Sequence, residues 1–203
     1  NVLKAYGIYI DDENLPPSIL LEHCPNTLVN SISQKKLSKV QISYSIYQIA
    51  EGMKYIHSRQ IWHGNLDQSC ILINDEGLIK ICNFGNSVIE SQKNKIKDDD
   101  DEDEDPSEFN DVRAFGYLVY YILTGKTYDS KTKMRQKDFT KLSFQLIPAC
   151  LCENYKRADQ PTFSIICELL NEHRYNLLSL TNEEQQEVSE MVDQYKSLIE
   201  NIH

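Results

Sequence analysis

The stretches IWHGNLDQSCILI at residues 61–73 and ICNFG at residues 81–85 carry the strongest structural signal in this sequence. Within them, the apolar runs CILI and LIKIC flank the turn sequence NDEG at residues 74–77, which predicts a β-hairpin. A polar segment that contains Asn65 lies before the first run, and a short turn that contains Asn83 follows the second run.

The sequence of most of the remaining chain predicts helices. Residues 38–58 carry apolar side chains at spacings of three and four, which is typical of an amphipathic helix. Residues 111–124 are apolar almost all round, which predicts a helix buried on every side, with Asp111 capping its start and Gly125 its end. Further helices are predicted at residues 139–152, at residues 161–173 opening on Pro161, and after the capping box TNEE at residues 181–184.

The N-terminal part predicts strands instead. Residues 1–10 and 18–24 are apolar runs separated by DDENLPP, a charged turn that contains proline. The order of elements is therefore two strands, a helix, a loop with a hairpin, and then only helices. This order predicts a mainly α (α+β) fold.

Composition excludes several function classes. The chain has 203 residues, enough for one full-sized core or for most of a larger domain. Its net charge of −10 argues against general binding to nucleic acid or to anionic membranes, and no apolar run approaches the length of a membrane span. The six cysteines contain no CxxC pair, which predicts reduced thiols in an intracellular, cytoplasmic protein and no metal site.

In order and spacing, these motifs resemble a protein kinase, and specifically its hinge and helical C-lobe. The family has H-R-D-L-x-x-x-N, then a strand, a turn and D-F-G, which residues 63–70 and 83–85 match in position. The other matching stretches are LLEHCPN at 20–26, YQIAEGMKYIHS at 47–58, DVRAFGYLVYYILTGK at 111–126 and CLCENYKRADQPTF at 150–163. The last of these resembles tyrosine-kinase-like kinases. The resemblance covers roughly residues 1–172 and implies a kinase-like C-lobe with hinge strands and a catalytic-loop hairpin, and with the N-lobe largely absent.

The resemblance also shows which catalytic positions differ. The base of the family falls on Asn65, which is neutral and cannot accept a proton there. The metal-binding Asn falls on Cys70, whose soft thiol is a poor magnesium ligand, and the Asp of D-F-G falls on Asn83. Asp67 places a negative charge where serine/threonine kinases have a lysine, and Gly64 replaces an arginine.

Other positions match residues that hold the shape of the family. His63 and Phe84 match two members of the hydrophobic column of a kinase core, and Gly85 completes the D-F-G turn. Asp111 matches the carboxylate that accepts hydrogen bonds from the catalytic-loop backbone. The positions implied for the hinge and the adenine pocket are Leu21, Glu22, Cys24 and Leu72.

This combination predicts a pseudokinase, a catalytically impaired kinase-like domain that acts as a scaffold or as an allosteric, protein-interaction module and is not an enzyme. Binding of ATP and magnesium is expected to be weak or absent, so no cofactor is predicted. Two alternatives stay open. One is an active protein kinase with atypical phosphoryl-transfer residues, in which Asp67 takes over as base. The other is an accessory domain of a larger signalling protein.

The predicted boundaries follow the same resemblance. Residues 1–25 would be the last N-lobe strands and the hinge, 26–172 the C-lobe with a degenerate acidic activation segment at 83–110, and 173–203 a C-terminal amphipathic helix. The run Asp98–Asp105 is unbroken acid, which fits either a solvated loop or a docking strip for a basic protein partner. A protein partner is therefore predicted, and partners among nucleic acids and membranes are not.

Overall fold

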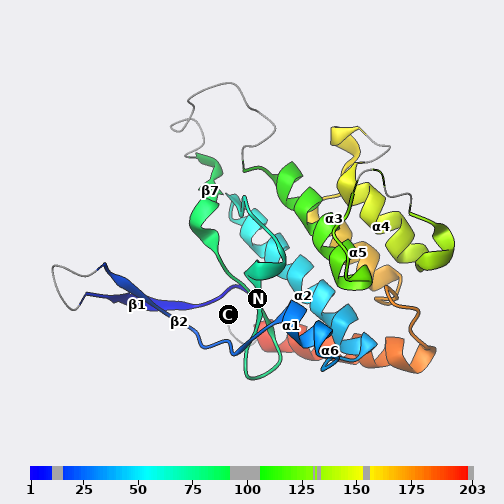
Figure 1. Cartoon of the computed structure of the whole chain (residues 1–203), viewed down its shortest axis with the longest axis horizontal. Helices are drawn as coiled ribbons and strands as arrows, with labels where there is room; N and C mark the ends of the chain where they lie inside the picture. Colours follow the sequence, from blue (N-terminus) through cyan, green and yellow to red (C-terminus); the bar gives the residue numbers. More distant parts are fainter. Residues whose placement is uncertain (11–15, 92–105, 130, 132–133, 153–155, 201–203) are drawn as a thin grey trace.

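The chain is described by a computed structural model, in which most of the predicted elements are present (Figure 1). The described residues are 1–10, 16–91, 106–129, 131, 134–152 and 156–200. The strands are β1 Ala5–Tyr9, β2 Ser18–Leu21, β3 Asn26–Thr27, β4 Ile61–Trp62, β5 Ile71–Ile73, β6 Ile79–Ile81 and β7 Val88–Ile89. The α-helices are α1 Leu28–Ser33, α2 Lys39–Ser58, α3 Glu108–Thr124, α4 Lys141–Leu151, α5 Phe163–Glu172 and α6 Asn182–Glu200. Short 3-10 helices are η1 Gln68–Cys70, η2 Phe84–Asn86, η4 Gln136–Asp138 and η5 Arg157–Asp159. The acidic run Asp98–Asp105 lies outside the described residues.

The core is helical, as the mainly α prediction required. Helix α2 begins with a capping box between Ser38 and Gln41 and buries most of one face, and α5 and α6 pack against it. Helix α3 packs against α4, and α2 and α3 lie at the centre of the molecule (Figure 1). No helix in the described part of the chain is both long enough and apolar enough to cross a membrane.

The central helix starts earlier than predicted. Helix α3 begins at Glu108, and its N-cap is Ser107, whose hydroxyl oxygen accepts a hydrogen bond from the backbone of Asn110 at 3.2 Å. The prediction that Asp111 caps this helix is therefore wrong, because its carboxylate is used elsewhere. The predicted end is confirmed: Gly125 has φ of 68°, a left-handed conformation that glycine adopts without strain.

The C-terminal helices follow the predicted pattern with shifted starts. Pro161 does not open α5, because Thr162 is the N-cap and the helix begins at Phe163. The capping box at α6 is confirmed, since the Thr181 amide donates to Glu184 at 2.8 Å and the Glu184 amide donates to the Thr181 hydroxyl at 3.2 Å. Residues 173–181 are not helical, because the chain turns there through left-handed residues, among them Tyr175 with φ of 55°.

The predicted hairpin is formed by β5 and β6, with Ile71 opposite Ile81 and with β3 on the other side of β5. Its turn is tightened by Gly77, with φ of 79°. The buried side chain of Gln48 on α2 accepts a hydrogen bond from the Ile79 amide at 2.8 Å, which fixes the hairpin to the helical core. The segments before β5 and after β6 consequently lie side by side.

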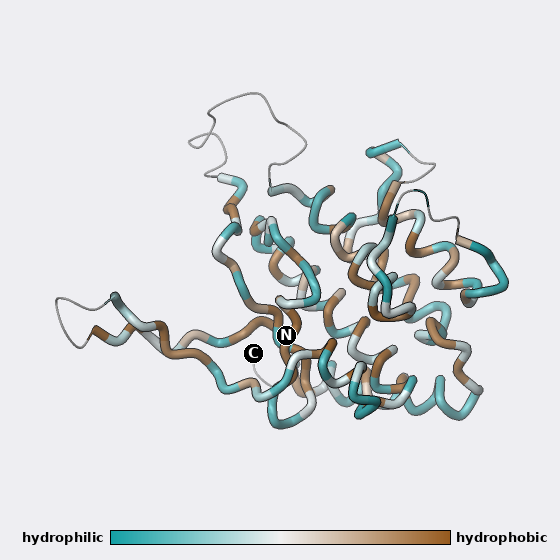
Figure 2. Tube along the Cα trace, in the orientation of Figure 1, coloured by the Kyte–Doolittle hydropathy of each residue, from teal (hydrophilic) through white to brown (hydrophobic). Residues whose placement is uncertain are grey.

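The two predicted N-terminal strands, β1 and β2, are also confirmed and pair antiparallel. They project away from the helices as a two-stranded ribbon (Figure 1), and Figure 2 shows that this ribbon is largely apolar. Ile8 and Ile19 face each other across it and are 69% and 64% exposed. An isolated two-stranded ribbon has no core of its own, so these side chains have no cover among the described residues.

Candidate active site

The loop before β5 is organised by one buried carboxylate. Asp111 on α3 is 1% exposed and accepts hydrogen bonds from the backbone amides of His63 at 2.7 Å and Gly64 at 2.9 Å. It also lies 2.8 Å from Nε2 of His57 on α2. These are the backbone hydrogen bonds that the sequence predicted for Asp111. His57 is an additional partner that the sequence reasoning missed, because it lies 54 positions away from Asp111 along the chain.

His63 and Phe84 connect this loop to the turn after β6. Nε2 of His63 donates to the carbonyl oxygen of Cys82 at 2.9 Å, and Nδ1 accepts from the Asn65 amide at 3.3 Å, so the ring is held as one neutral tautomer. The ring centroids of His63 and Phe84 are 4.8 Å apart. Gly85 lies in η2, where an added Cβ would have its nearest neighbour at 4.0 Å, so nothing in the structure requires glycine there.

The positions that would hold magnesium in the family bond to each other. The amide nitrogen of Asn83 donates to the sulfur of Cys70 at 3.7 Å, and the Cys70 thiol donates to the carbonyl oxygen of Asn65 at 3.2 Å. Burial raises the pKa of the Cys70 thiol, so it stays protonated. A neutral amide and a protonated thiol do not fit a magnesium ion, which prefers charged oxygen ligands. In the described part of the chain, no group of three metal-ligating side chains exists.

Asp67 is the carboxylate on this loop. Its Oδ1 accepts from the Ser69 amide at 2.7 Å and from the Ser69 hydroxyl at 2.6 Å, which caps η1. Desolvation acts to raise the pKa of Asp67, but these hydrogen bonds outweigh it and the pKa is lowered. The side chain is therefore an anion at neutral pH. Asn65 lies two residues before it and is exposed.

The hinge positions are held by a charge pair that the sequence did not reveal. Glu22 accepts from Nζ of Lys80 on β6 at 2.8 Å. Desolvation opposes ionisation, but the hydrogen bonds from Lys80 and from the Lys4 backbone lower the pKa of Glu22. Leu21 is half exposed at the base of the ribbon, and burial together with the charge of Glu22 raises the pKa of Cys24. Leu72 lies partly buried on β5.

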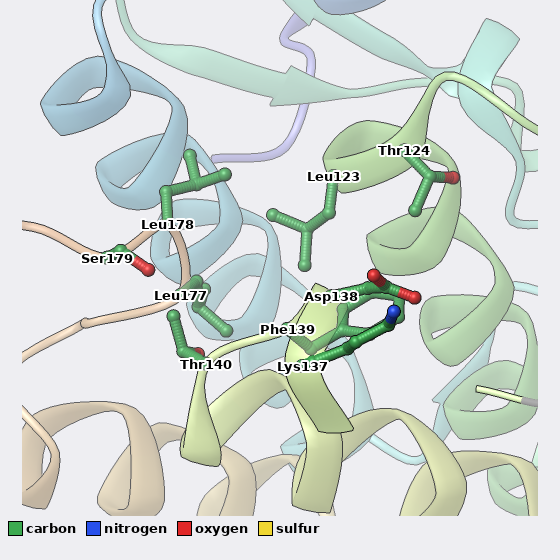
Figure 3. A pocket seen from close by; sticks show the side chains of 9 residues that line it. All are labelled: Leu123, Thr124, Lys137, Asp138, Phe139, Thr140, Leu177, Leu178 and Ser179. Atoms are coloured by element: carbon green, nitrogen blue, oxygen red, sulfur yellow. The ribbon is translucent and has the colours of Figure 1, made fainter. Parts of the chain in front are cut away.

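Hollows lie both beside the candidate site and away from it. One, of about 190 Å³, lies between the end of α3, the segment before α4 and the loop between α5 and α6 (Figure 3). It is lined by Lys137, Thr140 and Ser179 among others and by none of the predicted site residues. The other, of about 340 Å³, adjoins Asp67 and is the one next to the candidate site.

Comparisons with known proteins agree with this geometry. The family described as "Protein kinase domain" matches residues 1–189. An Aurora kinase of Candida glabrata is 26% identical over 194 residues, covering 89% of this chain and 52% of that protein. The serine/threonine-protein kinase plk-2 of Caenorhabditis elegans is 33% identical over 65% of this chain and 23% of its own length. The probable serine/threonine-protein kinase CCRP1 of Zea mays is 26% identical over 74% of this chain and 25% of its own length.

These relatives correct one expectation. They are named as serine/threonine protein kinases and share the kinase domain, which points to enzymatic activity. The prediction that this chain is not an enzyme is therefore wrong. That prediction rested on the absence of charged side chains at Asn65 and Asn83. It gave these single residues more weight than the match of the whole domain. The chain spans between about a quarter and about half of the length of these three relatives.

Proposed function

Since this chain belongs to the protein kinase family, we propose that it forms the C-lobe of a serine/threonine protein kinase domain with atypical phosphoryl-transfer residues. The serine/threonine preference rests on the names of its relatives. The CLCENYKRADQPTF stretch at residues 150–163 supports a place near the tyrosine-kinase-like branch of the family. An intracellular location is part of the same proposal.

One observation carries the proposal. The buried Asp111 carboxylate holds the amides of His63 and Gly64, and the His63 ring contacts Phe84. A charged carboxylate buried in a core is costly unless every oxygen is satisfied, so this arrangement fixes the loop firmly. Phosphoryl transfer depends mainly on positioning, and these hydrogen bonds hold the loop that would position a substrate hydroxyl.

The proton-accepting group in this proposal is Asp67. In the transfer step, the substrate hydroxyl oxygen would form a bond to the γ-phosphorus of ATP and the bond from that phosphorus to the bridging oxygen would break. The hydroxyl proton would pass to the Asp67 carboxylate, because Asn65 has no basic lone pair to receive it. The hydrogen bonds from Ser69 that lower the pKa of Asp67 make it a weak base, so the rate would be low.

Nucleotide and metal binding are proposed to be weak. The Asn83 and Cys70 side chains satisfy each other and offer no charged oxygen to magnesium. In this proposal the domain still transfers phosphate, but at a low rate.

The experiment is a phosphoryl-transfer assay on the full-length protein with a mixed serine/threonine peptide library, comparing wild type with Asp67→Asn and Asp75→Asn. Asp75 is an exposed acid in the β5–β6 turn and serves as the matched control. We expect slow transfer that Asp67→Asn reduces by about 10²-fold or more and that Asp75→Asn leaves unchanged. Transfer that is equally fast in all three proteins would refute the role of Asp67, and absence of transfer in wild type would refute the activity.

Protein binding is a second candidate function, favoured by the apolar ribbon of β1 and β2. Exposed apolar surface of this kind marks interaction sites, and the ribbon carries Tyr6, Ile8 and Ile19, each more than half exposed. A basic partner that binds Asp98–Asp105 belongs to the same candidate. Replacing Ile8 and Ile19 together by threonine should weaken association of the 203-residue chain, as measured by sedimentation velocity. Unchanged association would exclude the ribbon as the binding surface.

A further inference from the structure

Two cysteines face each other at the open end of the β5–β6 hairpin. Ile71 pairs with Ile81 in the ladder, and the next residues outward are Cys70 and Cys82. The Cys82 amide donates to the Cys70 carbonyl oxygen at 2.9 Å, so the pairing continues through them. Residues that pair in this way have Cα atoms about 5.5 Å apart and side chains on one face of the sheet. This separation lies within the range of about 4.4–6.8 Å at which a disulfide can form.

The two sulfur atoms lie beside the same short stretch of backbone. The Cys82 sulfur lies 4.0 Å from the carbonyl oxygen of Ser69, the residue before Cys70. The Cys70 sulfur lies 3.7 Å from the side-chain nitrogen of Asn83, the residue after Cys82. Each sulfur therefore contacts a chain neighbour of the other cysteine. Because the backbones are already close enough for a disulfide, rotation about the Cα–Cβ bonds is the main movement that bonding requires.

The two thiols differ in their access to solvent. Cys82 is partly exposed, whereas Cys70 is 0% exposed. A dissolved oxidant can therefore reach Cys82, and Cys70 is placed to complete the reaction from inside, as a resolving cysteine does. Burial raises the pKa of both thiols. Since only the thiolate attacks, the exchange should be slow, on the order of hours.

We propose that Cys70 and Cys82 form a reversible disulfide when the protein meets a low-molecular-weight disulfide. The Cys82 sulfur first bonds to one sulfur of the oxidant, and the other oxidant sulfur leaves as a thiol with the Cys82 proton. The Cys70 sulfur then bonds to the Cys82 sulfur, and the second oxidant sulfur leaves with the Cys70 proton. Two protein thiols are thereby oxidised, and one small disulfide is reduced to two thiols.

This disulfide changes the hydrogen bonds of the candidate site. In the reduced protein the Cys70 thiol donates to the Asn65 carbonyl oxygen at 3.2 Å and to Oδ1 of Asp67 at 3.5 Å. A disulfide sulfur carries no proton, so both hydrogen bonds are lost, and the loop is tied to the turn after β6 instead. The modification goes beyond the proposed function, and only its effect on phosphoryl transfer rests on that function.

The test is peptide mapping of the full-length protein after incubation with oxidised glutathione, with the remaining thiols then blocked by N-ethylmaleimide. Trypsin cuts after arginine and lysine, which places Cys70 in the peptide 60–80 and Cys82 in the peptide 81–93, each with one cysteine. We expect these two peptides to be joined at least about tenfold more often than either is joined to another cysteine peptide. Dithiothreitol should separate them.

Two variants report the two steps. Cys82→Ser should give no linked peptide and leave Cys70 without glutathione. Cys70→Ser should stop after the first step and accumulate glutathione on Cys82, at least about tenfold above wild type. The matched control is Cys152→Ser at the end of α4, because Cys152 is also partly exposed and burial also raises its pKa. We expect the control to form the Cys70–Cys82 link like wild type.

Three results on wild type would overturn the proposal, whatever the variants do to folding. They are glutathione on Cys82 without the link, a link from Cys82 to Cys24, and no reaction of Cys82. The test uses no ATP, so it is separate from the proposed function. A linked protein that transfers no phosphate supports the disulfide and refutes the activity, whereas an active protein without the link does the reverse.

Discussion

Two regions beside the loop before β5 and the turn after β6 differ in chemistry. One is the junction at which Asp111 on α3 meets the backbone of the loop, and the other is the face formed by Asn65, Cys70 and Asn83. At the junction, a charged group is 1% exposed and each of its oxygens accepts hydrogen bonds from the loop backbone. On the other face, the side chains of Asn65, Cys70 and Asn83 are neutral: the Asn83 amide donates to the Cys70 sulfur, and the Cys70 thiol donates to the backbone carbonyl of Asn65 and to the Asp67 carboxylate.

The difference shows that the residues that stabilise the fold of this site are not the residues that set its chemistry. Removing the buried acceptor would leave backbone donors unpaired in the core, which costs folding free energy directly. Exchanging a charged side chain for a neutral one at an exposed position costs little, because water solvates either form. The junction is therefore constrained by stability, and the exposed side chains of Asn65 and Asn83 are constrained by stability much less.

The largest expected effect is that of Asp111→Asn on stability. An amide offers one acceptor oxygen, and its NH₂ group would face a backbone donor, so at least one buried hydrogen bond is lost. We expect a loss of about 3 kcal/mol in the free energy of unfolding, since the acceptor is charged. Chemical unfolding followed by circular dichroism measures it. A loss below about 0.5 kcal/mol would show that the junction is not what holds the loop.

Asn65→Asp should act on catalysis and leave stability nearly unchanged. It restores a proton acceptor at the position that the kinase resemblance assigns to the base. We expect about a tenfold higher transfer rate, below the about 10²–10⁴-fold typical of general bases because the metal-binding positions stay atypical. Initial rates at saturating ATP are the measurement, and Asn65→Gln is the neutral control. An equal gain in the glutamine variant would exclude proton transfer as the cause.

Alkaline pH should weaken the helical framework through buried phenols. Burial raises the pKa of Tyr44 on α2 from the ordinary value of 10 to about 12. The folded state therefore keeps this proton more tightly, and the stabilisation is complete below pH 10 and is lost as pH rises toward 12. At about pH 11 we expect Tyr44→Phe to recover about 1 kcal/mol of the lost free energy of unfolding. Denaturant titrations at neutral and alkaline pH test this, and identical pH dependence in the two proteins would contradict it.

The smallest expected effect is that of Asn83→Asp on stability. Asn83 is exposed and has φ of 68°, a left-handed conformation that Asp also tolerates. Its bond to the Cys70 sulfur is long, at 3.7 Å, so its loss should change the free energy of unfolding by at most about 0.5 kcal/mol. A change as large as that of Asp111→Asn would mean that Asn83 has a structural role.

Much of the fold could be predicted from the sequence, because its signals are local. The capping residues Ser38 and Thr181 precede apolar periodicity, and both helices begin where these signals indicate. The NDEG turn at residues 74–77 joins two short apolar runs, and the hairpin forms there. Loop and turn positions such as Asn65 and Asn83 could be found because the order and spacing of residues 63–70 and 83–85 resemble protein kinase motifs.

What the tertiary structure decided involves partners that are distant along the chain. Sequence patterns suggested that Asp111 caps its helix, but Ser107 does so, and the Asp111 carboxylate turns to the backbone of the loop at residues 63–64. The pairing of Glu22 with Lys80 joins the hinge to a strand far along the chain. The hollow of about 340 Å³ forms where α3 passes the loop that carries Asp67. Hydrogen bonds and hollows of this kind depend on which surfaces meet after folding, and periodicity along one segment holds no information about the segment packed against it.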